Sequence, residues 1–399
     1  MSEARAVRPG AERRWEERVN RAAHPLAYPL LARIRRPVLR VPRLGVVVTD
    51  AELLRGALLN SAFTKTGPGS PADLWTPVLG PAVLLNMEGL DHRALRGRLA
   101  PLFAPAFVGA LTAETLGERA ARLTERLVDG EPVDLVTEVR EYAGQVISRL
   151  VGLDEEVLGG ELFDRVSAVT GFVRLSRPRF TPAQVRAARA VLDELTVHAR
   201  RAYREAPAAP DIPAALTVPA RMRSLGLGED EAMGAVGAFV LTGTETLASY
   251  LPRVVALLAD TGWLARVAAD RSLLPAAVAE GLRVTTPSPV MLRSVAQESR
   301  VGDVAVHPGD RLILATFLAD RAAGPFDPER NPAAALKQLW FGAGAHFCLG
   351  APLAMAQITT VLTAVLDAQT RSPLGIRSRR AQRGTLIPGY ASLVLEAER

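Results

Sequence analysis

The sequence contains only one cysteine, and this scarcity limits the chemistry that the chain can support. A lone cysteine excludes an internal disulfide and any zinc or iron–sulfur site built from several cysteines. Lysine is almost as rare, with Lys65 and Lys337 alone, so arginine supplies nearly all of the positive charge. No run approaches the roughly 20 apolar residues that a membrane helix needs, and the polar start of the chain lacks a signal-peptide core. We therefore expect a cytoplasmic protein with no membrane partner.

The composition is that of a folded globular protein. Apolar residues make up 48% and charged residues 23% of the 399 residues, which excludes wholesale disorder. The net charge of +6 is small for this length, and acidic and basic residues alternate along most segments, so we expect no nucleic-acid partner. The length fits one large domain or several small ones. Because no linker is long enough to separate two domains, we predict one domain over residues 1–399, with about residues 1–12 flexible.

Apolar residues recur at helical spacing over most of the chain beyond Asp91. The predicted helices cover 91–103, 112–129, 134–152, 181–204 and 229–260. Strands are predicted at 38–49 with a break at Gly45, and at 304–306, 311–315 and 392–395. A capping box at 49–52 predicts a helix start, and the Pro- and Gly-rich stretch 66–86 predicts a long loop. The fold class is therefore mainly α with small β-sheets.

The single cysteine, Cys348, lies in the segment FGAGAHFCLG, just before a predicted helix over 351–368. The positive end of that helix and its free N–H groups stabilise a thiolate, and N–H donation to the sulfur suits a cysteinate ligand of haem iron. Phe341 and Phe347 would keep water away. One alternative is an inert, buried cysteine. A phosphate loop is disfavoured, because no glycine follows Gly344 at the spacing of the dinucleotide fingerprint.

This segment resembles the haem-binding loop of the cytochrome P450 superfamily, Phe-x-x-Gly-x-His-x-Cys-x-Gly, at every defined position. Phe341, Gly344, His346, Cys348 and Gly350 carry the match. Three further motifs follow the family's order, so the resemblance extends from about residue 38 to the end of the chain. It implies the P450 fold and a haem b cofactor whose iron is ligated by Cys348, with Phe341 and Gly350 beside it.

The second motif is Glu280-Gly281-Leu282-Arg283, which resembles the family's Glu-x-x-Arg. Residues three apart share a helix face, so Glu280 and Arg283 can pair. The resemblance implies a buried structural pair joined by Arg330, which stands in Phe326–Arg330. Taken alone, the motif fits a surface ion pair equally well.

The third motif lies in the long apolar helix, at Val240–Thr246. A glycine inside a helix costs about 1 kcal/mol relative to alanine, so Gly243 needs a reason. The resemblance implies that Gly243 leaves room for dioxygen, while Thr246 and Glu245 are the alcohol and acid that deliver protons. The alternative is a threonine hydroxyl that bonds back to the carbonyl four residues earlier and bends the helix.

The fourth motif is the pair His92 and Arg96, which four-residue spacing places on one helix face. The resemblance implies that this pair, together with Arg293 and His346, holds the haem propionates. Cationic donors suit two carboxylates, although each of these residues alone would fit a solvated charge.

The resemblance implies a haem-thiolate monooxygenase that inserts one oxygen atom of dioxygen into an organic substrate. Electrons are expected from a separate ferredoxin and its reductase, steered to a patch that includes Arg93, Arg98 and Lys337. One departure concerns the same face: Met355 and Gln357 replace the family's usual arginine and glutamate after the cysteine. Two rivals remain, a peroxide-driven enzyme on the same fold and a haem-binding sensor without turnover.

The substrate is expected to be a mid-sized, mostly apolar compound of secondary metabolite biosynthesis. By family position, the expected pocket lining is Trp75, Leu84, Phe239, Val240, Thr286, Val290, Met291 and Ile387. The expected entrance lies at 66–86 and 174–182, where Arg174, Arg177 and Arg179 gather. These arginines are either simply solvated or favour an acidic substrate or an acidic carrier protein.

Overall fold

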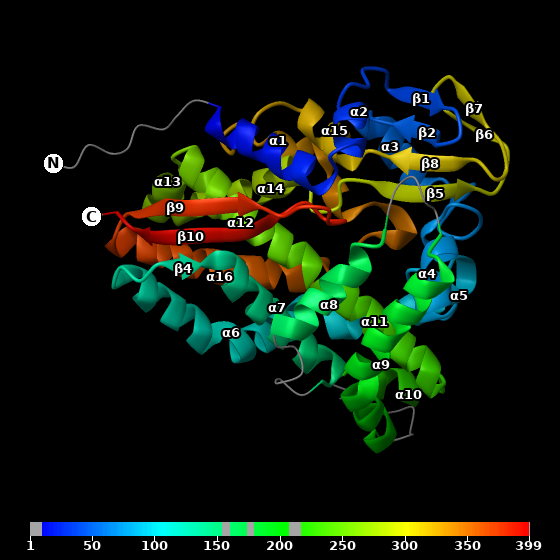
Figure 1. Ribbon diagram of the computed structural model, residues 1–399, viewed down its shortest axis with the longest axis horizontal. Coiled ribbons are helices and arrows are strands. Elements are labelled where there is room, and N and C mark those ends of the chain that lie inside the picture. Colours follow the sequence, from blue (N-terminus) through cyan, green and yellow to red (C-terminus); the bar gives the residue numbers. More distant parts are fainter. Residues whose placement is uncertain (1–9, 154–159, 174–178, 207–216, 399) are drawn as a thin grey trace.

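A computed structural model of the protein describes residues 10–153, 160–173, 179–206 and 217–398. Most of these residues are helical, which confirms the predicted mainly α fold with small sheets (Figure 1). The α-helices are α1 (Ala11–Ala23), α2 (Ala27–Leu31), α3 (Ala51–Leu59), α4 (Pro71–Leu79), α5 (Gly89–Leu99), α6 (Pro105–Val128), α7 (Leu135–Val151), α8 (Gly160–Thr170), α9 (Pro182–Glu205), α10 (Val218–Ser224), α11 (Glu229–Gly243), α12 (Glu245–Asp260), α13 (Trp263–Ala269), α14 (Leu274–Thr285), α15 (Thr316–Ala322) and α16 (Ala351–Arg371).

Three small sheets flank the helices within the described residues. The strands are β1 (Val38–Val41), β2 (Gly45–Val48), β3 (Phe63–Thr64), β4 (Val133–Asp134), β5 (Met291–Val295), β6 (Ser299–Val301), β7 (Val304–Val306), β8 (Arg311–Leu314), β9 (Leu374–Ala381) and β10 (Tyr390–Ala397). The largest sheet has the order β1-β2-β8-β5-β3, a second has β4-β10-β9, and β6 pairs with β7. Strand β2 is parallel to β8, while β5 is antiparallel to β8. Met291 of β5 packs against the cluster that contains Ala343, five residues before the cysteine, and Arg293 lies two residues further along the same strand.

Two local predictions about the first third of the chain need correction. The helix at α3 begins where expected, but its cap is the Asp50 carboxylate, which accepts from the N–H groups of Glu52 and Leu53. The predicted loop over 66–86 contains helix α4. Ser70 caps α4, and a proline at its first position is compatible with a helix because that N–H needs no partner.

The core is formed by long helices that pack against one another, with α16 running along α6. By length and composition alone α16 could cross a membrane, but 56% of its apolar window is buried inside the protein. Its hydropathy is therefore that of a central core helix. The first residue of α16 follows the cysteine loop, so the core fixes the position of the loop.

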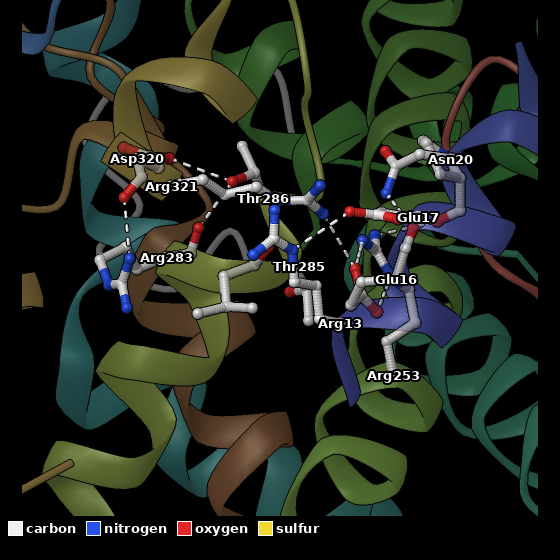
Figure 2. A network of polar contacts seen from close by, with 12 residues as sticks. Arg13, Glu16, Glu17, Asn20, Arg253, Arg283, Thr285, Thr286, Asp320 and Arg321 are labelled. Atoms are coloured by element: carbon white, nitrogen blue, oxygen red, sulfur yellow. Dashed lines mark hydrogen bonds and ion pairs between the residues drawn. The ribbon is translucent and has the colours of Figure 1, made fainter. Parts of the chain in front are cut away.

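Helix α1 is tied to the rest of the fold by the buried carboxylate of Glu16 (Figure 2). Glu16 accepts hydrogen bonds from both Nε and an amino group of Arg253 on α12 and from Arg321 on α15. Since an unpaired buried charge is costly, these contacts hold α1 in place. The prediction of flexibility at residues 1–12 concerns mainly residues outside the described ranges, and its last two residues belong to α1.

A second buried carboxylate in the same region, Asp320 on α15, has no cationic hydrogen-bond partner among the described contacts (Figure 2). Thr286 Oγ1 lies 2.7 Å from the Arg283 carbonyl oxygen and 3.2 Å from Oδ2 of Asp320. The Thr286 hydroxyl therefore lies between two acceptors, and Oδ1 of Asp320 has no hydrogen-bond partner among the described residues. Burial raises the pKa of Asp320 to about 8, although Thr286, Arg283 and Arg321 act in the opposite direction.

This raised pKa makes stability depend on pH. In the unfolded chain the pKa of aspartate is about 3.9, so the folded protein holds a proton that the unfolded chain releases between about pH 4 and pH 8. The stabilisation is complete below that window and is lost as the pH rises to about 8, by at most about 1.4 kcal/mol per pH unit. We expect Asp320→Asn to remove this dependence, measured as the wild-type minus variant unfolding free energy in urea. A difference that stays constant from pH 5 to pH 9 would contradict a protonated Asp320.

Candidate functional site

The cysteine loop, residues 341–350, is shaped by two glycines and one backbone bond. Gly342 and Gly344 have φ values of 81° and 67°, which side-chain-bearing residues rarely adopt. A Cβ on Gly344 would lie 3.2 Å from the Leu58 carbonyl oxygen, so this position also requires a close backbone approach. The Cys348 N–H donates to the Phe341 carbonyl at 2.9 Å and closes the loop.

The sulfur of Cys348 lies at the start of α16, as predicted. The N–H groups of Gly350 and Ala351 both donate to it and lower the pKa of the thiol, but burial raises that pKa by more. The side chain is nevertheless exposed. A thiol surrounded by protein yet still exposed lies in a recess, which is the setting expected of a ligand to a buried cofactor.

A groove of about 630 Å³ lies between α6, α16 and the cysteine loop. Its floor includes Phe341 and Phe347, whose ring centroids are 6.0 Å apart, and Met355 of α16 lines it as well. None of the described residues that line this groove carries a charge. The neighbouring Gln357 is buried, and its side-chain oxygen Oε1 has no hydrogen-bond partner among the described residues. Of the two departures from the family pattern after Cys348, Met355 therefore adds apolar surface to this groove, whereas Gln357 does not line it.

Near the sulfur, four predicted cationic residues come together from three segments. His92 and Arg96 lie on α5, Arg293 on β5, and His346 in the loop, where its ring is 4.1 Å from that of His92. Burial, reinforced by the neighbouring positive charges, lowers the pKa of His92 to about 4, and burial lowers the pKa of Arg293 to about 10. Burial also lowers the pKa of Arg96 and His346.

Two residues of this cluster were not predicted from the sequence. Lys65 is in the cluster, and burial and Arg293 lower its pKa to about 7. Glu88 accepts a hydrogen bond from the Lys65 N–H, and its carboxylate lies 2.9 Å from His346 Nε2. Glu88 is the one carboxylate that acts on Lys65, His92 and Arg293 in the described part of the chain. A surplus of destabilised cations beside a recessed thiol fits a cofactor that carries two carboxylates, so the residues fit haem.

The predicted long helix is broken at Thr244, between α11 and α12. Thr242, Thr244 and Thr246 each donate their hydroxyl to the carbonyl four residues earlier, at 2.7–2.8 Å. This is the bend-forming alternative considered above. Thr242 is exposed although it lies in the last turn of the largely buried helix α11, so α11 presents a polar residue to an open space just before the break.

The structure shows a close packing contact at Gly243. A Cβ built on Gly243 would lie 2.5 Å from Cδ1 of Ile147 on α7, closer than real side chains approach. The glycine therefore allows α11 and α7 to pack closely. Its expected role in making room for dioxygen stays a prediction.

The acid of the predicted pair, Glu245, points away from Thr246 and toward α8. It is buried, and Ser167 on α8 donates a hydrogen bond of 2.5 Å to it. Burial raises the pKa of Glu245, partly offset by Ser167 and Arg140, so its protonated form is favoured relative to an exposed glutamate. Ser167 is the third residue that the sequence did not indicate.

Glu280 and Arg283 form the buried pair that was predicted. Both side chains are fully buried, with two hydrogen bonds of 2.7 Å between them. The expected third member, Arg330, does not join them. Its side chain is 68% exposed and lies 4.0 Å from Asp327, because Glu280 instead accepts the N–H groups of Asp327 and Ala333.

Six of the eight predicted pocket residues are compatible with a pocket lining, and the other two face elsewhere. Trp75 packs edge-on against Phe180 at 5.2 Å, Phe239 packs against Phe103 at 5.3 Å, and Met291 is close to Gly342 of the cysteine loop. Leu84 and Ile387 are partly buried and Val240 is fully buried.

Two of the expected pocket residues face elsewhere. Thr286 is fully buried and bonded to Arg283 and Asp320. Val290 packs with Leu292 against a separate cluster around Ile313. At the expected entrance, Arg174 and Arg177 lie outside the described residues, while Arg179 is paired with Asp73 at 2.8 Å.

The fold and the site together define a haem-thiolate type of protein, with a recessed cysteine and a facing set of cationic groups. Comparison with known proteins agrees. The cytochrome P450 family model matches residues 266–370. A C-19 steroid 1alpha-hydroxylase of Sorangium cellulosum is 30% identical over 350 residues, covering 84% of this chain and 85% of that protein. The chain belongs to the cytochrome P450 family and is a P450 monooxygenase.

Other relatives point to the same family. A mycinamicin IV hydroxylase/epoxidase of Micromonospora griseorubida is 29% identical, over 87% of this chain and 88% of that protein. Among solved structures, P450BioI in complex with an acyl carrier protein ligated with hexadec-9Z-enoic acid matches with a TM-score of 0.78 and 19% identity. That match covers 95% of this chain and 99% of the P450BioI chain, and it confirms the fold.

Proposed function

We propose that this P450 inserts one oxygen atom of dioxygen into a mid-sized, mostly apolar organic substrate, with electrons from a separate ferredoxin and its reductase. The observation that carries the proposal is the recessed, exposed thiol of Cys348 beside the buried cationic cluster. We also propose that the chain works as one domain in the cytoplasm.

Haem would be held by Cys348 at the iron and by cationic groups at the propionates. When bound, haem supplies the dioxygen and electron chemistry that amino-acid side chains lack. Arg96 and Arg293 offer guanidinium forks suited to carboxylates, while His92, His346 and Lys65 add further donors. The N–H groups of Gly350 and Ala351 donate to the sulfur and moderate its electron density.

Protons would reach the reaction through Thr246 and Glu245. The Thr246 hydroxyl is held 2.8 Å from the Thr242 carbonyl, which leaves its oxygen lone pairs available to a water or to the oxygen substrate. Burial raises the pKa of Glu245 and Ser167 fixes its carboxyl group, so Glu245 would hold a proton behind the bend more readily than an exposed glutamate.

We expect Thr246→Ala to keep its fold and its haem but to lose most of its coupling. Product formed per reducing equivalent should fall by about tenfold or more, since a positioned proton donor commonly contributes about 10²–10⁴-fold. The measurement compares product, consumed reductant and released hydrogen peroxide in one reaction. Thr244→Ala is a matched control, because that hydroxyl makes the same type of back-bond but is fully buried. Equal coupling in all three proteins would show that protons travel by another route.

Electrons would enter at the apolar groove behind Cys348. Phe341 and Phe347 on its floor flank the cysteine, and the exposed residues Arg93, Arg98 and Lys337 offer positive charge for an acidic partner. Met355 adds apolar surface at a position where the resemblance to the family leads one to expect an arginine.

The substrate class is proposed from the relatives and the apolar lining. Trp75, Phe239 and Met291 offer apolar surface, and two relatives act, by name, on a steroid and on mycinamicin IV. An acidic carrier protein as partner is a further proposal, supported by the P450BioI complex, but Asp73 already neutralises Arg179.

The test is product formation with a surrogate ferredoxin and reductase, on compounds chosen by binding-induced spectral shifts. Product that requires both dioxygen and reductant supports the proposal. Product from peroxide alone would favour the peroxide-driven rival, and spectral binding without any product would favour the sensor.

A further inference from the structure

A second concave site lies between α1 and the start of the turn that joins β9 to β10. It is a partly enclosed pocket of about 630 Å³. Five of the nine lining residues are arginines, and none is acidic. These arginines are Arg18, Arg21, Arg379, Arg380 and Arg383. Figure 1 shows α1 lying along the β9–β10 hairpin, so two distant parts of the sequence contribute the charges.

Most of these charges are not neutralised by a neighbouring carboxylate. Arg379 forms a two-pronged pair with Asp260 at 2.6 and 2.9 Å. Arg18, Arg21, Arg380 and Arg383 have no acidic partner among the described contacts. This contrasts with arginines on the same elements outside the pocket, since Arg13 pairs with Glu17 and Arg377 with Glu396. The lining therefore presents several guanidinium groups with no carboxylate among the lining residues to balance their charge.

The walls of the pocket are held in place before any ligand arrives. The guanidinium groups of Arg18 and Arg379 lie over the ring of Trp15, at 4.7 and 4.3 Å from its centroid. The Gly384 N–H donates to the Ala22 carbonyl at 3.1 Å, which ties the turn to α1. Prepositioned guanidinium groups lose little freedom on binding, which favours affinity.

We propose that this pocket binds a compact polyanion, namely the diphosphate group of a small phosphorylated ligand. Guanidinium forks match phosphate oxygens, and four unpaired forks match the charge of two linked phosphates. A pocket of this volume is in the usual range for small-molecule sites, and its concave shape favours a small ligand over a flat lipid surface. The inference is independent of the proposed monooxygenase reaction.

One turn of the chain connects this pocket to the expected substrate pocket. The strand that carries Arg380 leads into the turn 382–389, where the Pro388 carbonyl accepts from Ser249 and Arg253 of α12. Ile387, an expected substrate-pocket residue, lies in the same turn. A ligand that joins α1 to β9 would therefore hold this turn against α12.

The test compares binding of pyrophosphate, ADP and inorganic phosphate to the purified holoprotein by calorimetry at about 20 mM and about 200 mM salt. The pocket variant is Arg21→Gln/Arg383→Gln. The matched control is Arg13→Gln/Arg377→Gln, which removes the same charge from the same or adjoining elements outside the pocket. Unfolding temperatures of both variants verify that the fold is kept.

We expect pyrophosphate and ADP to bind wild type more tightly than inorganic phosphate does, and the pocket variant to bind them at least about tenfold more weakly. The control variant should bind them as wild type does. Equal weakening in both variants would show a general charge effect and overturn the proposal. Retention on vesicles rich in phosphatidylglycerol, without measurable binding of pyrophosphate, would overturn it in favour of a membrane surface.

Discussion

Replacing Cys348 with alanine is expected to abolish the thiolate-type spectrum and all dioxygen-dependent turnover. The chain has no other cysteine, so no second thiolate can take the place of the lost one. The sulfur also accepts the N–H groups of Gly350 and Ala351, and alanine leaves both without that acceptor. The measurement is the absorption spectrum of the reduced, carbon-monoxide-bound protein, together with product formation.

The matched variant is Cys348→Ser, which keeps the size of the side chain and an acceptor for both N–H groups. It should keep the unfolding temperature of the wild type yet lose the thiolate-type spectrum, since an alcohol is a poor substitute for a thiolate ligand. If Cys348→Ala retained that spectrum, the assignment of the ligand would be wrong. If Cys348→Ser alone retained turnover, the thiolate would not be needed for the reaction.

The sequence predicted those parts of the site that depend on short-range patterns. Three features follow from spacing within one segment: the cysteine at the start of α16, the pairing of Glu280 with Arg283, and the shared helix face of His92 and Arg96. The same reasoning missed α4, because its Pro and Gly content suggested a loop. Ser70 and a first-turn proline nevertheless start a helix there.

The remaining residues could not be predicted, because they depend on contacts between distant segments. Lys65 and Glu88 lie near the cysteine loop because distant segments of the chain pack together there. Nothing in their local sequence indicates that they belong to the site. Ser167 reaches Glu245 across 78 residues of sequence. For Arg330 the motif predicted a contact that the structure does not contain. The backbone N–H groups of Asp327 and Ala333 bind Glu280 instead, and the Arg330 side chain is exposed.

The second large effect is expected for Arg283→Ala. Arg283 donates two hydrogen bonds to Glu280 and one each to the carbonyl oxygens of Asp320, Gly324 and Pro325. Its removal leaves a fully buried carboxylate without its cation and three carbonyl groups without this donor. Breaking one side of a buried ion pair costs about 3–5 kcal/mol, which is a large part of the stability of a typical protein.

The carbonyl groups that Arg283 holds belong to the segment 320–325, and Glu280 also fixes the N–H groups of Asp327 and Ala333. This segment leads to the cysteine loop, so Arg283→Ala should bind less haem and should also unfold at a lower urea concentration than the wild type. The double variant Glu280→Leu/Arg283→Met removes both charges and should recover part of the loss in urea. Arg283→Lys should fall between, since an ammonium cannot replace the two-pronged contact. An alanine variant within about 1 kcal/mol of wild type would show that the pair is dispensable, and the cysteine loop would then have to be held by the packing of α16 alone.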